Sequence, residues 1–322
     1  MLNDPSFKYV KKAKETRKTD WYRCGAEMIE RQFPVQLELE LNTDCNLRCP
    51  KCPQSKESFK KERLDYYDTI NCIAEGSKKG LESIKLQYRG EPLLYPYLIE
   101  VIRYAKSKGI YVHFNTNATL LTKNMSIALI KAGLDKIICS IDGCTKETYE
   151  KARRSGTFEN IVQNITILQA QKQVLGSNTP FVRVQAVKQE LNQEEIESGK
   201  YITFWSQRAD ELGIEQCFDF YDNTEDATPL PEWHCEQLWQ RLFILADGRV
   251  LPCCAGISYE HDTTNVYSVG NIHKETLENI WHNKEMSLYR EPHRTGNSHV
   301  LSMCRKCRLR KLVVKMVEEN RK

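Results

Sequence analysis

The sequence predicts an α/β protein in which a partial barrel of six parallel strands precedes a small cysteine-rich domain. Strand-like and helix-like segments alternate from residue 35, a cysteine triplet follows the first of these strands, and more cysteines gather after the alternation ends near residue 222. Such alternation is typical of a parallel sheet, because parallel neighbours need a crossover connection. A chain of 322 residues is long enough for one large and one smaller domain.

Six apolar, β-rich runs are the predicted strands, and five segments with helical periodicity lie between them. The strands are expected at residues 35–41, 83–88, 111–115, 136–141, 181–187 and 214–221. The helices are expected at residues 66–79, 97–108, 123–132, 158–174 and 193–212. In such folds ligands bind beyond the carboxyl ends of the strands, so we expect the chemistry in the loops that follow each strand.

The pattern changes at residues 222–231, a polar stretch with two prolines that predicts a linker. Beyond it, two apolar runs flank Asp247-Gly248, which is the strongest short-range signal for a β-hairpin. Residues 274–290 and the tail from Cys304 have helical patterns. We therefore expect an N-terminal extension at residues 1–33, the barrel at residues 34–222 and the cysteine-rich domain at residues 223–322.

The composition indicates which classes of partner and which cellular compartment to expect. The formal net charge is +4 and 28% of the residues are charged, which is too mild a basic excess to predict nucleic-acid binding. Lysine and arginine concentrate at residues 8–18 and 305–322, where a solvated surface is the first interpretation and an anionic partner the second. No apolar run approaches the ~18 residues of a transmembrane helix, and the N-terminus lacks a signal peptide. Thirteen cysteines without such a signal predict a reducing, cytoplasmic location and metal ligation rather than disulfides.

The most informative motif is the triplet Cys45, Cys49 and Cys52, with the spacing C-x3-C-x2-C directly after the first predicted strand. An ordinary 4Fe–4S cluster takes four cysteine ligands. Three close thiolates with no nearby fourth leave one iron open to a ligand that is not protein. The alternatives are a zinc knuckle, which needs a fourth ligand close in space, and a chance cluster.

This loop resembles the signature loop of the radical S-adenosylmethionine (radical SAM) enzymes. In that family three cysteines hold a 4Fe–4S cluster, and the amine and carboxylate of SAM occupy the open iron. The reduced cluster cleaves SAM to a 5′-deoxyadenosyl radical, which abstracts a hydrogen atom from the substrate. The resemblance implies that Cys45, Cys49 and Cys52 are the cluster ligands.

Two later motifs extend the resemblance toward SAM binding. Arg89-Gly90-Glu91-Pro is similar to the Gly-Gly-Glu motif that binds the methionyl ammonium of SAM, with Arg89 in place of the first glycine. A plain strand-to-loop turn is the alternative. Asn115-Thr-Asn117-Ala118 is similar to a Thr-Asn-Gly motif, with Ala118 in place of the glycine, and makes Asn117 a candidate SAM or substrate contact. The alternative for Asn117 is a helix cap.

The next two strands carry weaker candidates. The resemblance implies that Ser140 and Arg153 reach the ribose or carboxylate of SAM. Without it, Arg153 is interpreted as a surface side chain. Gln185 lies in an alternating strand and is a candidate contact for substrate or adenosine inside the barrel, with an ordinary amphipathic strand as the alternative.

A second cysteine set lies beyond residue 230. The pair Cys304 and Cys307 has C-x2-C spacing, and distant pairs that converge suit either zinc or a fully ligated iron–sulfur cluster. The stretch resembles a SPASM or twitch domain, which carries auxiliary 4Fe–4S clusters in a radical SAM subgroup. Five cysteines there imply a single auxiliary cluster, with ligands Cys235, Cys253, Cys304 and Cys307.

Cys254 is then left over as a candidate hydrogen-atom donor to a substrate radical. The alternatives are a small buried hydrophobe, or an exchange of roles in which Cys254 rather than Cys253 is the cluster ligand. Cys217 is a weaker candidate donor.

The expected activity is hydrogen abstraction from a small polar substrate, with two 4Fe–4S clusters and SAM as cofactors and epimerisation or dehydrogenation as the outcome. A carbohydrate or aminocyclitol is the first substrate class, because only about 33 residues precede the first strand, whereas peptide-modifying members usually have a longer domain to grip a leader peptide. Polar candidates inside the barrel are Gln87, Arg89, Arg183, Gln185 and Asp219.

Two alternatives remain at this point: a peptide-modifying radical SAM enzyme, and a non-catalytic iron–sulfur or zinc protein. The family expectation for the electron donor is a low-potential flavodoxin or ferredoxin. We expect neither a nucleic-acid nor a membrane partner.

Overall fold

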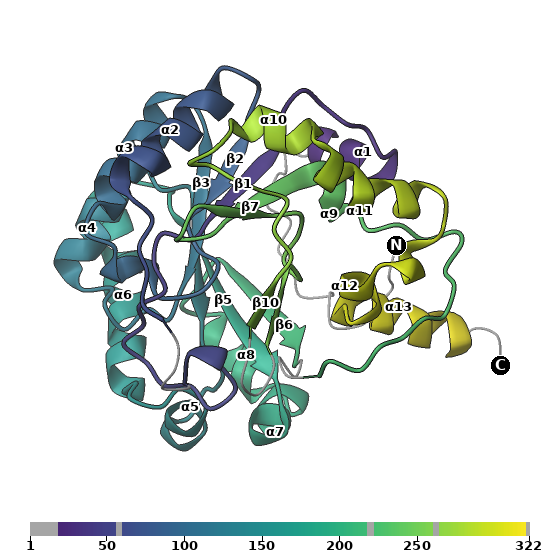
Figure 1. The fold of residues 1–322 in the computed structure, drawn as a ribbon. Coiled ribbons are helices and arrows are strands. Elements are labelled where there is room, and N and C mark those ends of the chain that lie inside the picture. The colour runs from purple at the N-terminus through teal and green to yellow at the C-terminus, as the bar shows by residue number, and fades with distance from the viewer. Residues whose placement is uncertain (1–18, 56–59, 218–221, 260–263, 320–322) are drawn as a thin grey trace. The chain divides into compact units, whose positions relative to one another are not determined.

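The computed structural model describes residues 19–55, 60–217, 222–259 and 264–319 (Figure 1). These residues form two compact units. The first unit contains residues 40–70 and 83–217, and the second contains residues 17–39, 71–82 and 218–322, apart from the stretches outside the described ranges. No helix in the described part of the chain is long and apolar enough to span a membrane.

The first unit is built on five parallel strands that are hydrogen-bonded in chain order. They are β2 (Ser83–Lys85), β3 (Tyr111–Thr116), β4 (Lys136–Ser140), β5 (Phe181–Lys188) and β6 (Glu211–Gln216). Helices α3 (Leu98–Ser107), α4 (Lys123–Ala132) and α6 (Phe158–Val174) run side by side along them (Figure 1). The parallel sheet with crossover helices confirms the predicted α/β class.

Strands β2 to β5 each have one buried face and one mostly half-buried face, whereas in β6 only Gly213 is buried. In β5, Val182, Val184 and Ala186 are fully buried, whereas the alternate residues Arg183 and Gln185 are half-buried. The apolar residues supply the core with the helices, and burial of each large apolar side chain contributes about 1.5–3 kcal/mol. The other face, which we call the inner face, is left for polar side chains.

Helices α4 and α6 have the predicted bounds, but the predicted helix at residues 193–212 is wrong. Two short helices, α7 (Gln193–Glu197) and α8 (Lys200–Trp205), lie there instead, and β6 begins at Glu211. Gly199 separates the helices with a left-handed φ of +78°, a conformation that ends a helix. The last residues of the predicted sixth strand, 218–221, lie outside the described residues.

The second unit contains a small mixed sheet. Strand β1 (Gln36–Leu39) runs parallel to β7 (Arg241–Ile244), which forms the expected hairpin with β8 (Arg249–Leu251). Strand β11 (Gly270–Asn271) pairs with β8, and β9 (Ile257–Tyr259) pairs with β10 (Thr264–Val266). The helices are α1 (Thr19–Ala26), α9 (Gln237–Gln240), α10 (Leu277–His282), α11 (Lys284–Arg294), α12 (Ser302–Arg305) and α13 (Arg308–Glu319).

The remaining elements are helices α2 (Tyr66–Ser77) and α5 (Lys146–Ala152) and the single-turn helices Pro53–Ser55, Pro92–Leu94, Glu190–Asn192 and Ser298–Val300. The single helix expected at residues 274–290 is in fact α10 and α11, which meet at Asn283. The Asn283 side chain accepts a hydrogen bond from Met286 N at 2.8 Å and so starts a new helix.

A buried arginine fixes helix α11 in the second unit. Arg290 lies over the Trp281 ring at 4.0 Å and forms an ion pair with Glu30 at 2.9 Å. It also donates hydrogen bonds to the carbonyl oxygens of Leu238 and Trp281, at 3.0 and 2.6 Å. Removing one partner of a buried charged side chain lowers the free energy of unfolding by about 3–5 kcal/mol. These contacts therefore hold helix α11 in one position.

The hairpin turn gives a prediction for stability. Gly248 has φ +84°, and a Cβ there would lie 2.6 Å from Cε1 of His273. We expect Gly248→Ala to destabilise the protein by about 1–2 kcal/mol through its left-handed backbone, with a further loss from the contact. Thermal unfolding of this variant and of Gly248→Ala/His273→Ala separates the two effects, because the double variant should recover only the contact part. An unchanged melting temperature in the single variant would contradict the turn geometry.

Candidate functional site

The three cysteines of the first motif lie in one loop of the first unit. The loop is closed by hydrogen bonds from Cys52 N to Cys49 O at 3.0 Å and from Leu47 N to Cys45 Sγ at 3.5 Å. Burial raises the pKa of all three thiols, to about 11 for Cys45, and the charges of Cys49 and Cys52 raise that of Cys45 further. The three thiols are therefore close enough to act on one another electrostatically.

The Arg-Gly-Glu-Pro turn packs against the segment that leads into this loop. Gly90 has φ +68°, and a Cβ there would collide with the carbonyl oxygens of Asn42 and Asp44. Glu91 N donates to Asp44 O at 2.7 Å, and Asn42 Nδ2 donates to Glu91 O at 3.1 Å. Only glycine fits this close approach, which accounts for Gly90 at this position of the motif.

The Glu91 carboxyl joins this turn to the next strand end. It is fully buried and accepts hydrogen bonds from Thr116 Oγ1 at 2.6 Å, Asn117 N at 2.7 Å and Leu93 N at 3.2 Å. Burial raises its pKa to about 7, although the three donors act in the opposite direction. The carboxyl therefore has internal partners whether or not an external cation is present.

Asn117 points at the cysteine loop. Its Nδ2 lies 2.9 Å from Asn46 Oδ1 and 3.8 Å from Cys45 Sγ. The helix-cap alternative is wrong, because Thr122 caps α4 by accepting from Met125 N at 3.3 Å. Ala118 has φ +60°, which is the left-handed conformation that a glycine would adopt more easily.

Arg153 lies beside the loop with only 17% of its side chain exposed, so the surface alternative is wrong for it. Its Nε forms an ion pair with Asp142 Oδ2 at 2.7 Å. Its hydrogen bond and charge act on Cys49, where they lower a thiol pKa that burial raises. A cation fixed this way favours the thiolate form that a metal ligand needs.

Ser140 and Gln185 are neighbours in the β4–β5 register on the inner face. Among the described residues, neither side chain hydrogen-bonds the cysteine loop. The same face carries a charged network. Arg183 lies 3.1 Å from Glu211 and 3.3 Å from Glu215, and Lys136 lies 2.8 Å from Glu211.

Two other polar candidates of the barrel, Arg89 and Gln87, hydrogen-bond other residues of the first unit. Arg89 Nη2 donates to the buried carboxylate of Glu40 at 2.6 Å. Gln87 Nε2 donates to Tyr88 O at 2.6 Å. Asp219 lies outside the described residues. The candidate donor Cys217 is half-buried at the end of β6.

The second cysteine set surrounds one hollow of about 320 Å³ in the second unit. Cys235, Cys253, Cys304 and Cys307 all line it, together with Trp233, His293, Met303 and Arg310. Burial raises the pKa of all four thiols, to about 12 for Cys304. Cys253 is 7% exposed, whereas Cys254 is exposed and is not among the lining residues.

Two further groups touch this hollow. His293 Nε2 lies 3.4 Å from Cys304 Sγ, while its Nδ1 lies 3.1 Å from Cys235 N, and burial lowers the pKa of the imidazole to about 4. Arg310 is fully buried and donates to Asp226 O at 2.6 Å. Its positive charge lowers the pKa of Cys304 against the effect of burial.

The donor sets fit clusters better than single ions. Within the described ranges, no three His, Cys, Asp or Glu side chains converge closely enough to hold one metal ion. A 4Fe–4S cluster demands less convergence, because each thiolate binds a different iron. Three thiols in the first loop and four around the cysteine-lined hollow match the donor numbers of one open and one fully ligated cluster.

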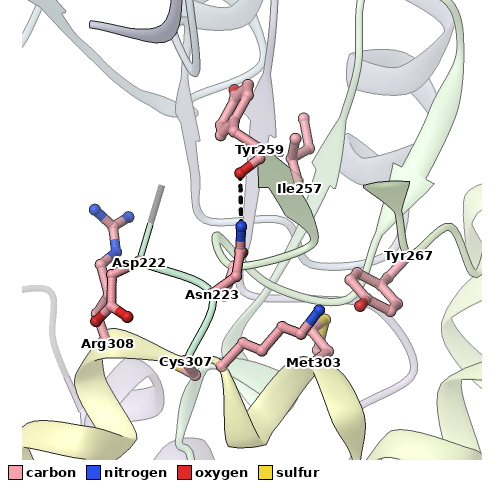
Figure 2. Close-up of a pocket in the computed structure, with 10 residues that line it drawn as sticks. Asp222, Asn223, Ile257, Tyr259, Tyr267, Met303, Cys307 and Arg308 are labelled. Atoms are coloured by element: carbon pink, nitrogen blue, oxygen red, sulfur yellow. Dashed lines mark hydrogen bonds between the residues drawn. The ribbon is translucent and has the colours of Figure 1, made fainter. Parts of the chain in front are cut away.

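A second hollow, of about 440 Å³, adjoins the first and shares Ala255, Met303 and Cys307 with it. Figure 2 shows Tyr259 and Tyr267 on its walls, with Asn223 Nδ2 donating to Tyr259 O at 2.8 Å. Lys306 and Arg308 bring basic groups to its lining.

Several of these groups were missed by sequence reasoning. Asn46 directly follows Cys45, and Asp142 directly follows the fourth predicted strand. Their places in these motifs could have marked both as site residues. His293 and Arg310 had no such signal, since each lies in a helix with no metal-ligand spacing to the cysteines.

Comparison with known families matches both parts of the chain. Residues 39–185 match the model of the Radical SAM superfamily. Residues 235–308 match SPASM, described as an iron-sulfur cluster-binding domain.

Curated relatives differ in how much of the chain they share. The "Tungsten-containing aldehyde ferredoxin oxidoreductase cofactor-modifying protein" of Pyrococcus furiosus is 25% identical over 85% of this chain and 87% of its own length. The GTP 3′,8-cyclase of Chlorobaculum tepidum is 33% identical over 39% of this chain and 38% of its own. The AdoMet-dependent heme synthase of Methanosarcina barkeri is 34% identical over 42% of this chain and 39% of its own length. The last two matches thus span less than half of each relative.

Solved structures share the fold. BtrN in complex with AdoMet and 2-DOIA has a TM-score of 0.55 at 16% identity and covers 87% of this chain and 94% of its own. Streptococcus suis SuiB bound to precursor peptide SuiA has a TM-score of 0.58 at 18% identity, over 86% and 71%. anSMEcpe with bound AdoMet has a TM-score of 0.59 at 13% identity, over 79% and 83%.

The Glu91 carboxyl gives a pH-dependent prediction. Its pKa is about 7 in the folded chain against a usual 4.5, so the folded state binds this proton more tightly than the unfolded state. The stability it contributes is present below about pH 4.5 and is lost as the pH rises through about 7, with a total of up to a few kcal/mol. Urea unfolding from pH 5 to 8 should show this decline in the wild type and a flatter profile in Glu91→Gln. An equal dependence of the unfolding free energy on pH in the two proteins would contradict a raised pKa of Glu91.

Proposed function

We propose that this chain, which belongs to the radical SAM superfamily and carries a SPASM domain, abstracts a hydrogen atom from a carbon of a small polar substrate. The abstracting species is the 5′-deoxyadenosyl radical, and the product is an epimer or a two-electron-oxidised compound. SAM and two 4Fe–4S clusters are the cofactors that these two domains imply.

One observation carries the proposal: three strand-end motifs are hydrogen-bonded to one another around the cysteine loop. Glu91 contacts Asp44 just before Cys45, and Asn117 contacts both Glu91 and Asn46. Residues from separate turns are thereby held at one point, which is what the binding of a cluster and SAM side by side requires.

We assign the first cluster to Cys45, Cys49 and Cys52, whose fourth iron is left to SAM. When reduced, this cluster supplies the electron that breaks a carbon–sulfur bond of SAM. Arg153 holds Cys49 by hydrogen bond and charge, and Asn117 lies against Cys45.

We assign the SAM contacts to residues at or after the ends of these strands. Gly90 and Glu91 present backbone oxygens and a carboxyl to the methionyl ammonium. Ser140 and Gln185, adjacent on the inner face, are assigned to the ribose and adenine side of SAM, and Arg153 to its carboxylate.

We assign the auxiliary cluster to Cys235, Cys253, Cys304 and Cys307, because all four line the same hollow. Burial of Cys253 and exposure of Cys254 support this choice between the neighbours. The exposed thiol of Cys254 is then the proposed hydrogen donor for an epimerisation.

For the substrate, we propose a carbohydrate or aminocyclitol. The half-buried face of β4 and β5, which carries Ser140 and Gln185, supports it, since hydroxyl and amide groups hydrogen-bond hydroxyl and amino groups. A second candidate is an enzyme cofactor, favoured by the Pyrococcus furiosus cofactor-modifying relative, which matches over most of both chains. The proposed electron donor is a low-potential flavodoxin or ferredoxin.

The test of the radical chemistry is the triple variant Cys45→Ala/Cys49→Ala/Cys52→Ala. We expect anaerobically prepared wild type to hold about eight irons and the variant about four, because only the auxiliary cluster remains. Formation of 5′-deoxyadenosine after reduction should disappear in the variant and persist in Cys72→Ala, whose buried cysteine lies in helix α2. Retained cleavage in the triple variant, or zinc in place of iron, would overturn the proposal.

The substrate class is tested by the coupled yield of 5′-deoxyadenosine. Aminocyclitols, hexoses, the cofactor released from a tungsten-containing aldehyde ferredoxin oxidoreductase and short peptides are each incubated with enzyme, SAM and reductant. We expect a rise above the uncoupled rate with the sugar-like compounds. A rise with peptides alone would remove the small-molecule proposal, and a rise with the released cofactor alone would favour the second candidate.

Cys254 is tested in deuterium oxide. If it returns the hydrogen atom, wild-type epimer carries deuterium from solvent at the reacting carbon, because a thiol proton exchanges. Cys254→Ala should still form 5′-deoxyadenosine but no epimer, whereas Cys217→Ala should behave as wild type. Labelled epimer from Cys254→Ala would exclude this cysteine as the donor.

A further inference from the structure

His293 connects two of the proposed auxiliary ligands that are far apart in sequence. It lies near the end of α11 and is 3% exposed. Its Nδ1 is 3.1 Å from the backbone nitrogen of Cys235, and its Nε2 is 3.4 Å from the Sγ of Cys304. One imidazole ring therefore contacts the backbone of one ligand and the sulfur of another.

The contact with Cys235 settles which ring nitrogen carries the proton. A backbone N–H can only donate, so Nδ1 must be the acceptor and cannot itself be protonated. A neutral imidazole has a single N–H, which must then sit on Nε2. The doubly protonated ring is excluded, because it would point Nδ1–H at the amide hydrogen of Cys235.

This tautomer makes His293 a donor to Cys304 rather than a metal ligand. A metal-bound nitrogen needs a free lone pair, and the lone pair of the ring is already used at Nδ1. The Nε2–H instead faces the Cys304 sulfur. The ring is held in this orientation by Trp233, whose ring packs edge-on with centroids 5.8 Å apart.

The helix that carries His293 is itself fixed. Arg290, one turn earlier on α11, is held by Glu30 and by the carbonyl oxygens of Leu238 and Trp281. The donor is therefore preorganised and does not have to move when the sulfur carries more negative charge.

From this geometry we propose that His293 raises the reduction potential of the auxiliary cluster by donating its Nε2–H to the Cys304 sulfur. The inference rests on the ligand set given under the proposed function. Hydrogen bonds to cluster sulfurs stabilise the reduced form, which carries one more negative charge, and so raise the potential. Arg310, a buried cation lining the same hollow, acts in the same direction. His293 is thus a positioning and tuning residue rather than a catalytic one.

The test is an EPR-monitored redox titration of the full-length enzyme with both clusters, in the presence of SAM so that the first cluster is distinguished by its shifted signal. His293→Leu removes both ring contacts, and His293→Gln can restore an acceptor for Cys235 and a donor for Cys304. We expect a more negative auxiliary midpoint potential in His293→Leu and a value near wild type in His293→Gln. His273→Gln, which changes an exposed histidine outside the lining of the hollow, is the matched control.

A second readout does not depend on activity or on the potential. Electron–nuclear double resonance in deuterium oxide should detect an exchangeable proton coupled to the auxiliary cluster in wild type and lose it in His293→Leu. Equal auxiliary midpoint potentials in wild type and both His293 variants, each with its full iron content, would overturn this inference but leave the proposed function standing. Loss of the auxiliary irons in both His293 variants would also overturn it, because it would make His293 a ligand. Four irons in the wild type would contradict the proposed ligand set itself.

Discussion

The buried carboxyl of Glu91 is the contact on which the first site depends. It accepts hydrogen bonds from Thr116 and from the backbones of Leu93 and Asn117, while its own backbone is anchored at Asp44. Loops at strand ends have no ladder of their own to fix them. Each buried donor left unpaired here costs about 1–3 kcal/mol, so the turns and the cysteine loop hold one another in register.

Much of this arrangement follows from local patterns. Apolar runs predicted strands β1 to β5 closely, and Asp247-Gly248 predicted the hairpin of the second unit after which Cys253 lies. Parallel strands place their carboxyl ends at one edge, so the order of the motifs along the chain was enough to expect Glu91 and Asn117 beside the cysteine loop.

The rest depends on packing, which sequence spacing does not report. Residues 193–212 look helical by periodicity, yet the left-handed Gly199 divides the helix and Leu212 joins a strand. The sequence alone favours a surface position for Arg153, and only the structure shows its ion pair with Asp142. His293 faces Cys304 only because α11 folds back over the hollow, and no motif relates the two positions.

The four cysteines around the 320 Å³ hollow come from well-separated parts of the chain: just before α9, just after the hairpin, and the two ends of the C-x2-C turn. A cluster that joins them acts as a cross-link, which lowers the conformational entropy of the unfolded chain and stabilises the folded one. Folding of the second unit is then linked to iron supply by mass action. Under the proposed ligand set, loss of iron would therefore lower the free energy of unfolding of the second unit as well as the activity.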